Sequence, residues 1–153
     1  MSEMLESILN VVIADDTNHK MELIIEAVRK CLPQAKLLTY DCCKEAAYCL
    51  CRAHCKEILE HPEQWLVITD MQMPLYSGES EINPTAGRHV LAEMSIAGLE
   101  CPALIASSEA VDNSAMSEIY AHYIGSLQVM YRCDIKEPLR KLLVKSGYLP
   151  AVS

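Results

Sequence analysis

The chain has 153 residues, 51% of them hydrophobic, and its formal net charge is -8. This length and this hydrophobic fraction fit one domain with a sizeable core. The negative charge argues against non-specific DNA binding, which requires a basic surface. No apolar run is long enough to cross a bilayer and the N-terminus lacks a basic signal-peptide region, so we expect a cytoplasmic protein without a membrane anchor.

The N-terminal third alternates apolar runs with amphipathic stretches. Residues 8–14 and 36–40 predict two short strands. Between them a helix is expected over 18–31, with Thr17 or Asn18 as its cap and an apolar stripe at Met21, Ile24, Ile25 and Val28. One long helix is expected from residue 42 to about residue 60, capped by Asp41.

The middle of the chain begins with an almost unbroken apolar and β-branched run at 65–70. Such a run suits a strand that is buried on both faces of a parallel sheet. Pro74 makes its continuation unfavourable, and the stretch 74–87 is rich in loop-forming residues. A third helix is expected over 87–97, with Gly98 as its C-terminal stop.

The C-terminal third repeats the alternation. Strands are expected at 102–106 and 127–131, and helices at about 112–123 and 134–146. Five strands alternating with five helices predict an α/β fold with a parallel sheet and right-handed crossovers.

Carboxylates follow two of the predicted strands. Asp15 and Asp16 come after the first, and Asp70 ends the third. If these strands are parallel neighbours the three acids converge, and their repulsion favours a cation such as Mg²⁺ among them. The alternative is that Asp15 and Asp16 only begin the next helix, where the dipole favours acids, and that Asp70 is a strand-end turn residue.

The spacing of these residues resembles the receiver domain of two-component response regulators. The resemblance rests on the Asp15-Asp16 pair, on the pattern D-x-x-M-P-x-x-x-G from Asp70 to Gly78, and on Ser107 after the fourth strand. It implies a signalling phosphoacceptor rather than an enzyme. A different flavodoxin-like enzyme is disfavoured, because no nucleophile constellation or glycine-rich phosphate loop is visible.

The resemblance covers about 8–147, so the whole chain, 1–153, is expected to be a single receiver domain. It implies a flavodoxin-like, doubly wound (βα)5 fold with a five-stranded parallel sheet in the order 2-1-3-4-5, as in chemotaxis receivers. Residues 79–86 look like an insertion relative to the family. They are expected to be either a tolerated surface loop or a lid or docking loop for a partner.

The resemblance also implies roles for individual residues. Asp70 would accept a phosphoryl group from a histidine kinase or phosphotransfer protein. Mg²⁺ would be held by Asp70, by Asp16 directly, by Asp15 directly or through water, and by the backbone carbonyl of Gln72. Ser107 would donate its hydroxyl to a phosphoryl oxygen and so shift the fourth helix.

Two positions depart from the family pattern. Arg132 stands where the family has a lysine, and Val129 stands where it has an aromatic switch residue, although Tyr131 could substitute for the ring. Lys136 could reach back only if its loop were remodelled. Two hypotheses therefore stay open: a phosphorylatable receiver with altered switching, and a pseudo-receiver that binds proteins without phosphorylation.

The expected output surface is the fourth helix, fifth strand and fifth helix, at about 112–146, which would serve a homodimer or a separate downstream protein.

A second feature is a group of cysteines around His54. A zinc or redox site there is less favoured than small hydrophobic thiols, since paired C-x-x-C motifs are missing. The group consists of Cys42, Cys43, Cys49, Cys51 and Cys55.

Overall fold

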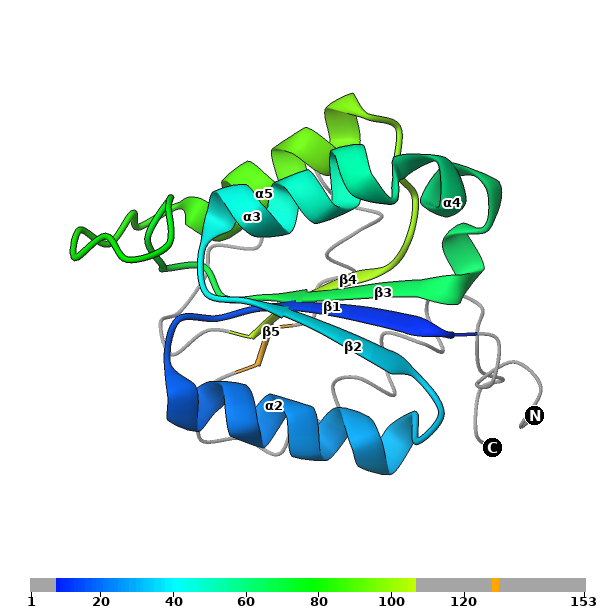
Figure 1. Ribbon diagram of the computed structural model, residues 1–153, viewed down its shortest axis with the longest axis horizontal. Coiled ribbons are helices and arrows are strands. Elements are labelled where there is room, and N and C mark those ends of the chain that lie inside the picture. Colours follow the sequence, from blue (N-terminus) through cyan, green and yellow to red (C-terminus); the bar gives the residue numbers. More distant parts are fainter. Residues whose placement is uncertain (1–7, 107–127, 130–153) are drawn as a thin grey trace.

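The structure, a computed structural model, describes residues 8–106 and 128–129, in which strands alternate with helices (Figure 1). The strands are β1 (Asn10–Ala14), β2 (Lys36–Tyr40), β3 (Trp65–Thr69), β4 (Ala103–Ala106) and β5 (Gln128–Val129). The helical segments are α2 (Asn18–Cys31), α3 (Cys43–Tyr48), the π-helical turn η1 (Cys49–Ala53), α4 (Cys55–Glu60), the 3-10 turn η2 (Pro62–Gln64) and α5 (Ala86–Ile96).

The strands form one parallel sheet in the order β2-β1-β3-β4-β5. This confirms the predicted flavodoxin-like order, with the order of strands reversing at β1 and β3. The fifth strand pairs with β4 through Gln128 and Val129, while the remainder of its predicted span lies outside the described residues. No helix in the described part of the chain is both long and apolar enough to span a membrane.

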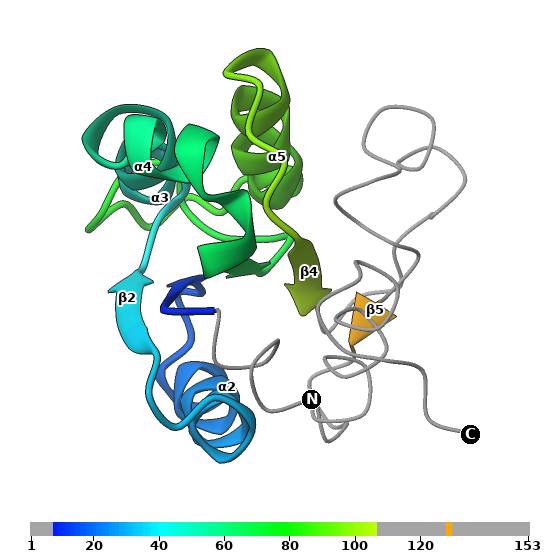
Figure 2. The same cartoon turned by 90° about the vertical axis from the view of Figure 1, so that its right-hand side faces the viewer.

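Helices cover both faces of the sheet. Figures 1 and 2 show α2 on one face and α3, α4 and α5 on the other. The two sides of β1 follow this division, because Val11 and Ile13 pack in the cluster beneath α2 while Val12 and Ala14 pack in the larger cluster on the opposite face. Every residue of β3 is buried, as expected for a central strand.

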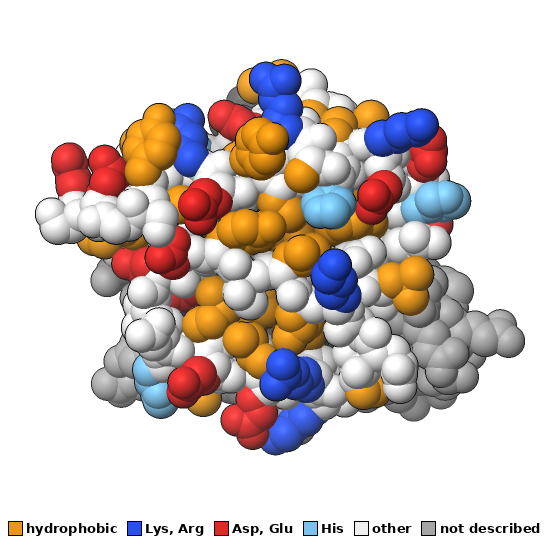
Figure 3. Space-filling view, viewed as in Figure 1, with side chains coloured by type: hydrophobic (Ala, Val, Ile, Leu, Met, Phe, Trp, Pro, Cys, Tyr) orange, Lys and Arg blue, Asp and Glu red, His pale blue; other side chains and the backbone are white. Residues whose placement is uncertain are grey.

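The edge strand β2 is only partly covered. Its residues Leu37, Leu38 and Tyr40 are half-buried, and Lys36 and Thr39 are exposed. Figure 3 shows hydrophobic side chains across the middle of this face of the molecule, between the helices above and below the sheet.

The prediction of one long helix over 42–60 is wrong. The chain widens into the π-helical turn η1, in which the His54 N–H donates to the Cys49 carbonyl at 3.0 Å, and His54 then leaves helical geometry before α4. The interruption lets Leu50 and Ile58 both bury fully, while Leu59 stays exposed. It also seats the His54 ring against Trp65, with the ring centroids 5.1 Å apart.

Helix ends agree only partly with prediction. Gly98 ends α5 as expected: it has φ +77°, and the Leu99 N–H donates to the Met94 carbonyl at 2.9 Å. Thr17 is the N-cap residue of α2 as expected, although its side chain makes no cap bond, whereas the prediction of Asp41 as a cap is wrong, because Cys42 stands at the N-cap of α3.

A loop projects between β3 and α5, at the same end of the sheet as the carboxyl ends of the strands (Figure 1). The bridge between Met73 and Asn83 closes its base. Gly78 lies at φ +85°, and the side chains of Tyr76 and Ile82 are exposed. The residues expected as an insertion, 79–86, make up its second half and the first residue of α5.

Candidate functional site

Sheet register places two acids side by side. Ala14, the last residue of β1, pairs with Thr69, the last residue of β3, so the following residues Asp15 and Asp70 meet at the same edge. The Asp70 N–H donates to the Ala14 carbonyl at 2.8 Å, which extends this pairing by one bond. The Asp15 N–H donates to the backbone carbonyl of Tyr40 in β2 at 3.0 Å. Backbone hydrogen bonds therefore fix both positions.

Asp15, Asp16 and Asp70 converge at this edge, and we call the site that they form the crevice, because open parallel sheets bind ligands at such a position. Each offers a carboxylate oxygen, and these oxygens lie within 4.8 Å of one another. Asp15 is 2% exposed and Asp70 6% exposed, while Asp16 is half-buried. Three carboxylates at this spacing, two of them buried and one half-buried, form a hard oxygen-ligand set.

Backbone amides hold the two buried carboxylates in place. Asp15 Oδ1 accepts the Thr17 N–H at 2.9 Å, in a turn that directly precedes α2. Asp70 Oδ1 accepts the N–H of its neighbour Met71 at 2.8 Å. Both side chains are thereby oriented into the crevice before any ligand arrives.

Lys20 is a member of this site that the sequence did not reveal. Its Nζ atom lies 3.1 Å from Asp15 Oδ2 and 3.2 Å from Asp70 Oδ1, and its side chain is only 9% exposed. Lys20 lies four residues before Ile24 on α2, so it continues the buried stripe of that helix. That spacing, one helical turn after Asp16, is the signal from which the ammonium could have been placed here.

Burial dominates the titration of the crevice. It raises the pKa of Asp15 to about 6, with the negative charge of Asp70 adding to the effect and the Thr17 N–H and Lys20 opposing it. Burial also raises the pKa of Asp70, against the lowering effects of Lys20 and of the backbone amides of Gln72 and Met71. The acids thus carry an unfavourable charge concentration that a bound cation would relieve.

One buried oxygen tests whether these residues suit Mg²⁺. Asp15 Oδ2 meets no well-aligned hydrogen-bond donor among the described residues, and its approach to Lys20 is an ion pair rather than a good hydrogen bond. A buried carboxylate oxygen whose close partner is an ammonium cation, next to two further carboxylates, matches the ligand preference of Mg²⁺. The donor set therefore fits this ion.

The start of α5 presses against the backbone of Asp70. A Cβ atom on Gly87 would collide with the Asp70 carbonyl oxygen and would lie 3.0 Å from Met71 Cα. The Gly87 N–H donates to the Met71 carbonyl at 3.0 Å, and the Cys43 thiol donates to the Ala86 carbonyl at 3.3 Å. The absence of a side chain at Gly87 is what permits this close approach.

The other predicted site residues are placed less completely. Gln72 is half-buried two residues after Asp70, and its backbone N–H lies close enough to lower the pKa of that acid. Coordination by its carbonyl stays a prediction. Ser107 and Arg132 lie outside the described residues, as do Tyr131 and Lys136.

The cysteine group shows the properties of packed thiols. Cys42, Cys43 and Cys49 are buried, and burial is the main cause that raises the pKa of each. Within residues 8–106 and 128–129, the Cys51, His54 and Cys55 side chains do not form a group of metal-ligand geometry, and Cys42 lies in such a group only with the exposed carboxylates of Asp41 and Glu45. A high thiol pKa leaves little thiolate at neutral pH, which supports the hydrophobic role.

No protein-family model matches the chain, and no curated protein does. Among solved structures, the chemotaxis protein CheY4 of Vibrio cholerae is 15% identical, with a TM-score of 0.58 over 91% of this chain and 98% of that one. A CheY-like receiver domain protein of Methanospirillum hungatei is 12% identical, with a TM-score of 0.58 over 92% and 94% of the two chains.

A third similar structure is the phosphorylated cyanobacterial phytochrome response regulator RcpA, which is 18% identical with a TM-score of 0.53 over 92% of this chain and 90% of that one. All three are response regulators or CheY-like proteins by description. The chain therefore has the fold of response regulator receiver domains, as its acid motif predicted.

Proposed function

We propose that the chain is a response regulator receiver domain, whose Asp70 accepts a phosphoryl group from a histidine kinase or phosphotransfer protein. The observation that carries the proposal is the convergence of Asp15, Asp16 and Asp70 at the carboxyl ends of β1 and β3. Ligands of open parallel sheets bind at this switch point. The crevice thus combines a carboxylate nucleophile with a cation site.

The proposed reaction begins with a carboxylate oxygen of Asp70 attacking the phosphorus of a phosphorylated histidine. An O–P bond forms while the N–P bond breaks, and the departing imidazole keeps the electron pair of that bond. Asp70 must be ionised to attack, and the Met71 N–H at 2.8 Å and Lys20 at 3.2 Å favour its ionised form. The result is an acyl phosphate on Asp70 and a signalling protein rather than an enzyme with turnover.

We assign the Mg²⁺ ligands to Asp15, Asp16, Asp70 and the backbone carbonyl of Gln72. When bound, the ion would neutralise charge that builds up on the phosphoryl oxygens during transfer. The Thr17 and Met71 amides hold Asp15 and Asp70 in position for it.

The read-out part of the proposal rests on residues outside the described ranges. Ser107 would donate its hydroxyl to the phosphoryl group, and Arg132 would supply the positive charge of the family's lysine. The surface at about 112–146 would then bind a downstream protein or a second copy of the chain. A planar guanidinium can pair with a phosphoryl group through two parallel hydrogen bonds, so Arg132 keeps the charge but changes the geometry.

One observation favours the alternative of a phosphorylation-independent binding module. Lys20 already forms ion pairs with Asp15 and Asp70, so the crevice is partly neutralised without a metal ion. In a pseudo-receiver such a lysine would serve structure alone. Partner binding would then be the same for wild type and for Asp70→Asn.

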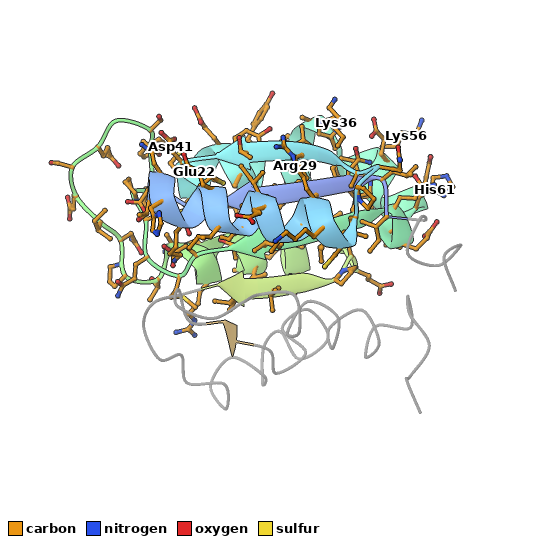
Figure 4. The ribbon with its side chains drawn as sticks, turned by 90° about the horizontal axis from the view of Figure 1, so that it is seen from below. Glu22, Arg29, Lys36, Asp41, Lys56 and His61 are labelled. Carbon is orange, nitrogen blue, oxygen red and sulfur yellow. The ribbon has the colours of Figure 1, made fainter. Side chains whose placement is uncertain are left out.

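The test is intact mass after incubation with Mg²⁺ and a small phosphodonor. Asp41→Asn is a matched control, because Asp41 is exposed at the end of the neighbouring strand β2 (Figure 4). We expect one added phosphoryl group on wild type and on Asp41→Asn, and none on Asp70→Asn. The absence of any addition to the folded wild type would sink the phosphoacceptor and favour the binding module.

A further inference from the structure

Lys20 is buried where a lysine is costly. Its side chain is 9% exposed, and the residue lies in the first turn of α2, where the helix dipole disfavours a positive charge. Lysine is almost never buried without a partner. The first turn of α2 contains no acid, so the compensating charges are those of Asp15 and Asp70, which directly follow the strands β1 and β3. The crevice acids, rather than the helix, therefore explain the position of this side chain.

The ammonium lies where a metal ion would have to bind. Its Nζ is 3.1 Å from one carboxylate and 3.2 Å from another, and the oxygens of the acid trio lie within 4.8 Å of one another. A Mg²⁺ ion binds oxygen at roughly 2.1 Å and would draw on the same carboxylate groups, those of Asp15 and Asp70. Two cations this close repel each other, so both cannot keep these contacts.

We propose that Lys20 is a built-in counter-ion that competes with Mg²⁺ for Asp15 and Asp70. The inference deepens the proposed function and rests on it for its meaning, because it adds a regulation to the same site. The Lys20 side chain is a flexible stem with a compact charge, so it can swing out without moving α2. The competition raises the Mg²⁺ concentration at which the crevice is loaded and at which Asp70 becomes competent.

The first experiment titrates Mg²⁺ alone into the full chain by calorimetry. Lys20→Gln removes the competing charge, and Lys30→Gln removes the same charge from the other end of α2, where Lys30 is exposed and pairs with Glu26 at 3.1 Å. We expect Lys20→Gln to bind Mg²⁺ about tenfold more tightly than wild type. Lys30→Gln should change the affinity by less than about twofold, as expected for a screened surface charge.

A third variant covers the case in which Lys20→Gln does not fold. Lys20→Arg keeps the positive charge and should bind Mg²⁺ within about threefold of wild type. Circular dichroism establishes the fold of each variant before titration. Equal or weaker Mg²⁺ binding by folded Lys20→Gln, including no binding by either protein, would overturn the proposal.

A second experiment uses wild type and therefore does not depend on the folding of a variant. Reductive methylation with peptide mass spectrometry reports how accessible each lysine amine is. Lys20 should be protected without Mg²⁺ and modified faster with it, while Lys30, whose side chain is 53% exposed, reacts equally in both conditions. Unchanged protection of Lys20 at saturating Mg²⁺ would show that the ion and the ammonium do not compete.

These outcomes are independent of phosphorylation. If Mg²⁺ displaces Lys20 but intact mass shows no phosphoryl addition, the counter-ion proposal for Lys20 is supported and the phosphoacceptor proposal for Asp70 is contradicted. If wild type accepts the phosphoryl group while Lys20→Gln binds Mg²⁺ no more tightly than wild type does, the phosphoacceptor proposal is supported and the counter-ion proposal is contradicted.

Discussion

Asp15 and Asp70 face each other with carboxylate oxygens no more than 4.8 Å apart, and the charge of Asp70 contributes to raising the pKa of Asp15 to about 6. Burial is the larger cause of that rise. The two acids are therefore held together at an energetic cost by the register of β1 and β3. Such strain is common at functional sites, where activity rather than stability has shaped the residues.

Asp15→Asn should stabilise the metal-free protein at neutral pH. Because the pKa of Asp15 is higher in the folded state than its ordinary 3.8, its stabilising contribution is complete below pH 3.8 and is lost as pH rises through about 6. We expect near-equal stability of variant and wild type at about pH 3.5, and a gain on the order of 2 kcal/mol for the variant at about pH 7.5. Urea unfolding in EDTA measures both.

Asp41→Asn is the control for this comparison. Asp41 is exposed, so its replacement should alter the unfolding free energy by less than about 0.5 kcal/mol at either pH. A loss of stability in Asp15→Asn at neutral pH would contradict the prediction, since it would mean that the ion pair with Lys20 outweighs burial and repulsion.

Mg²⁺ binding should weaken as the crevice acids take up protons. Metal ligation requires ionised carboxylates, and Asp15 holds a proton over half of the time below about pH 6. We expect the dissociation constant for Mg²⁺ to rise by about tenfold between pH 7 and pH 5. Calorimetry at constant ionic strength measures the dissociation constant at each pH. An affinity for Mg²⁺ that is independent of pH in this range would argue against metal ligation by these acids.

The acids of the site could be placed from the sequence, whereas their cation could not. Carboxyl ends of adjacent parallel strands share one edge, so Asp15 and Asp70 converge once β1 and β3 are neighbours. The buried face of the predicted helix was assigned from apolar residues alone, so Lys20 was not included in it. The partners of Lys20 are Asp15 and Asp70, which follow β1 and β3, and no local sequence pattern predicts a contact with residues so placed.

The interruption of the second predicted helix was also beyond local reasoning. Helix propensity and the spacing of apolar residues both predict a continuous helix across Cys49–Ala53, and neither Gly nor Pro marks a break there. The turn widens so that Leu50 and Ile58 can both bury and His54 can pack on Trp65. Those are tertiary contacts, which override propensity.

Gly87→Ala should destabilise the protein although it replaces glycine within a helix. Alanine ordinarily favours a helix over glycine by about 1 kcal/mol. Here its Cβ would strike the Asp70 backbone, and we expect a net loss of about 1–3 kcal/mol. Urea unfolding measures the change, with Ser95→Ala on the exposed side of α5 as control.

The same substitution should also affect the site. Because the clash is with the Asp70 carbonyl, Gly87→Ala should weaken Mg²⁺ binding, while Ser95→Ala leaves it unchanged. A more stable Gly87→Ala protein with wild-type Mg²⁺ affinity would show that α5 can move away from Asp70 without cost.

The buried thiols should react only when the protein unfolds. Cys101 is fully buried with its pKa raised to about 12, and burial raises the pKa of Cys43 to about 11, so neither supplies an accessible thiolate. Native protein treated with iodoacetamide at about pH 7.5 should leave both unmodified, and their labelling rate in urea should follow global unfolding. Peptide mass spectrometry assigns each cysteine. Rapid labelling of Cys43 in the native state would contradict the packed-thiol interpretation of the cysteine group, because it would require an accessible thiolate there.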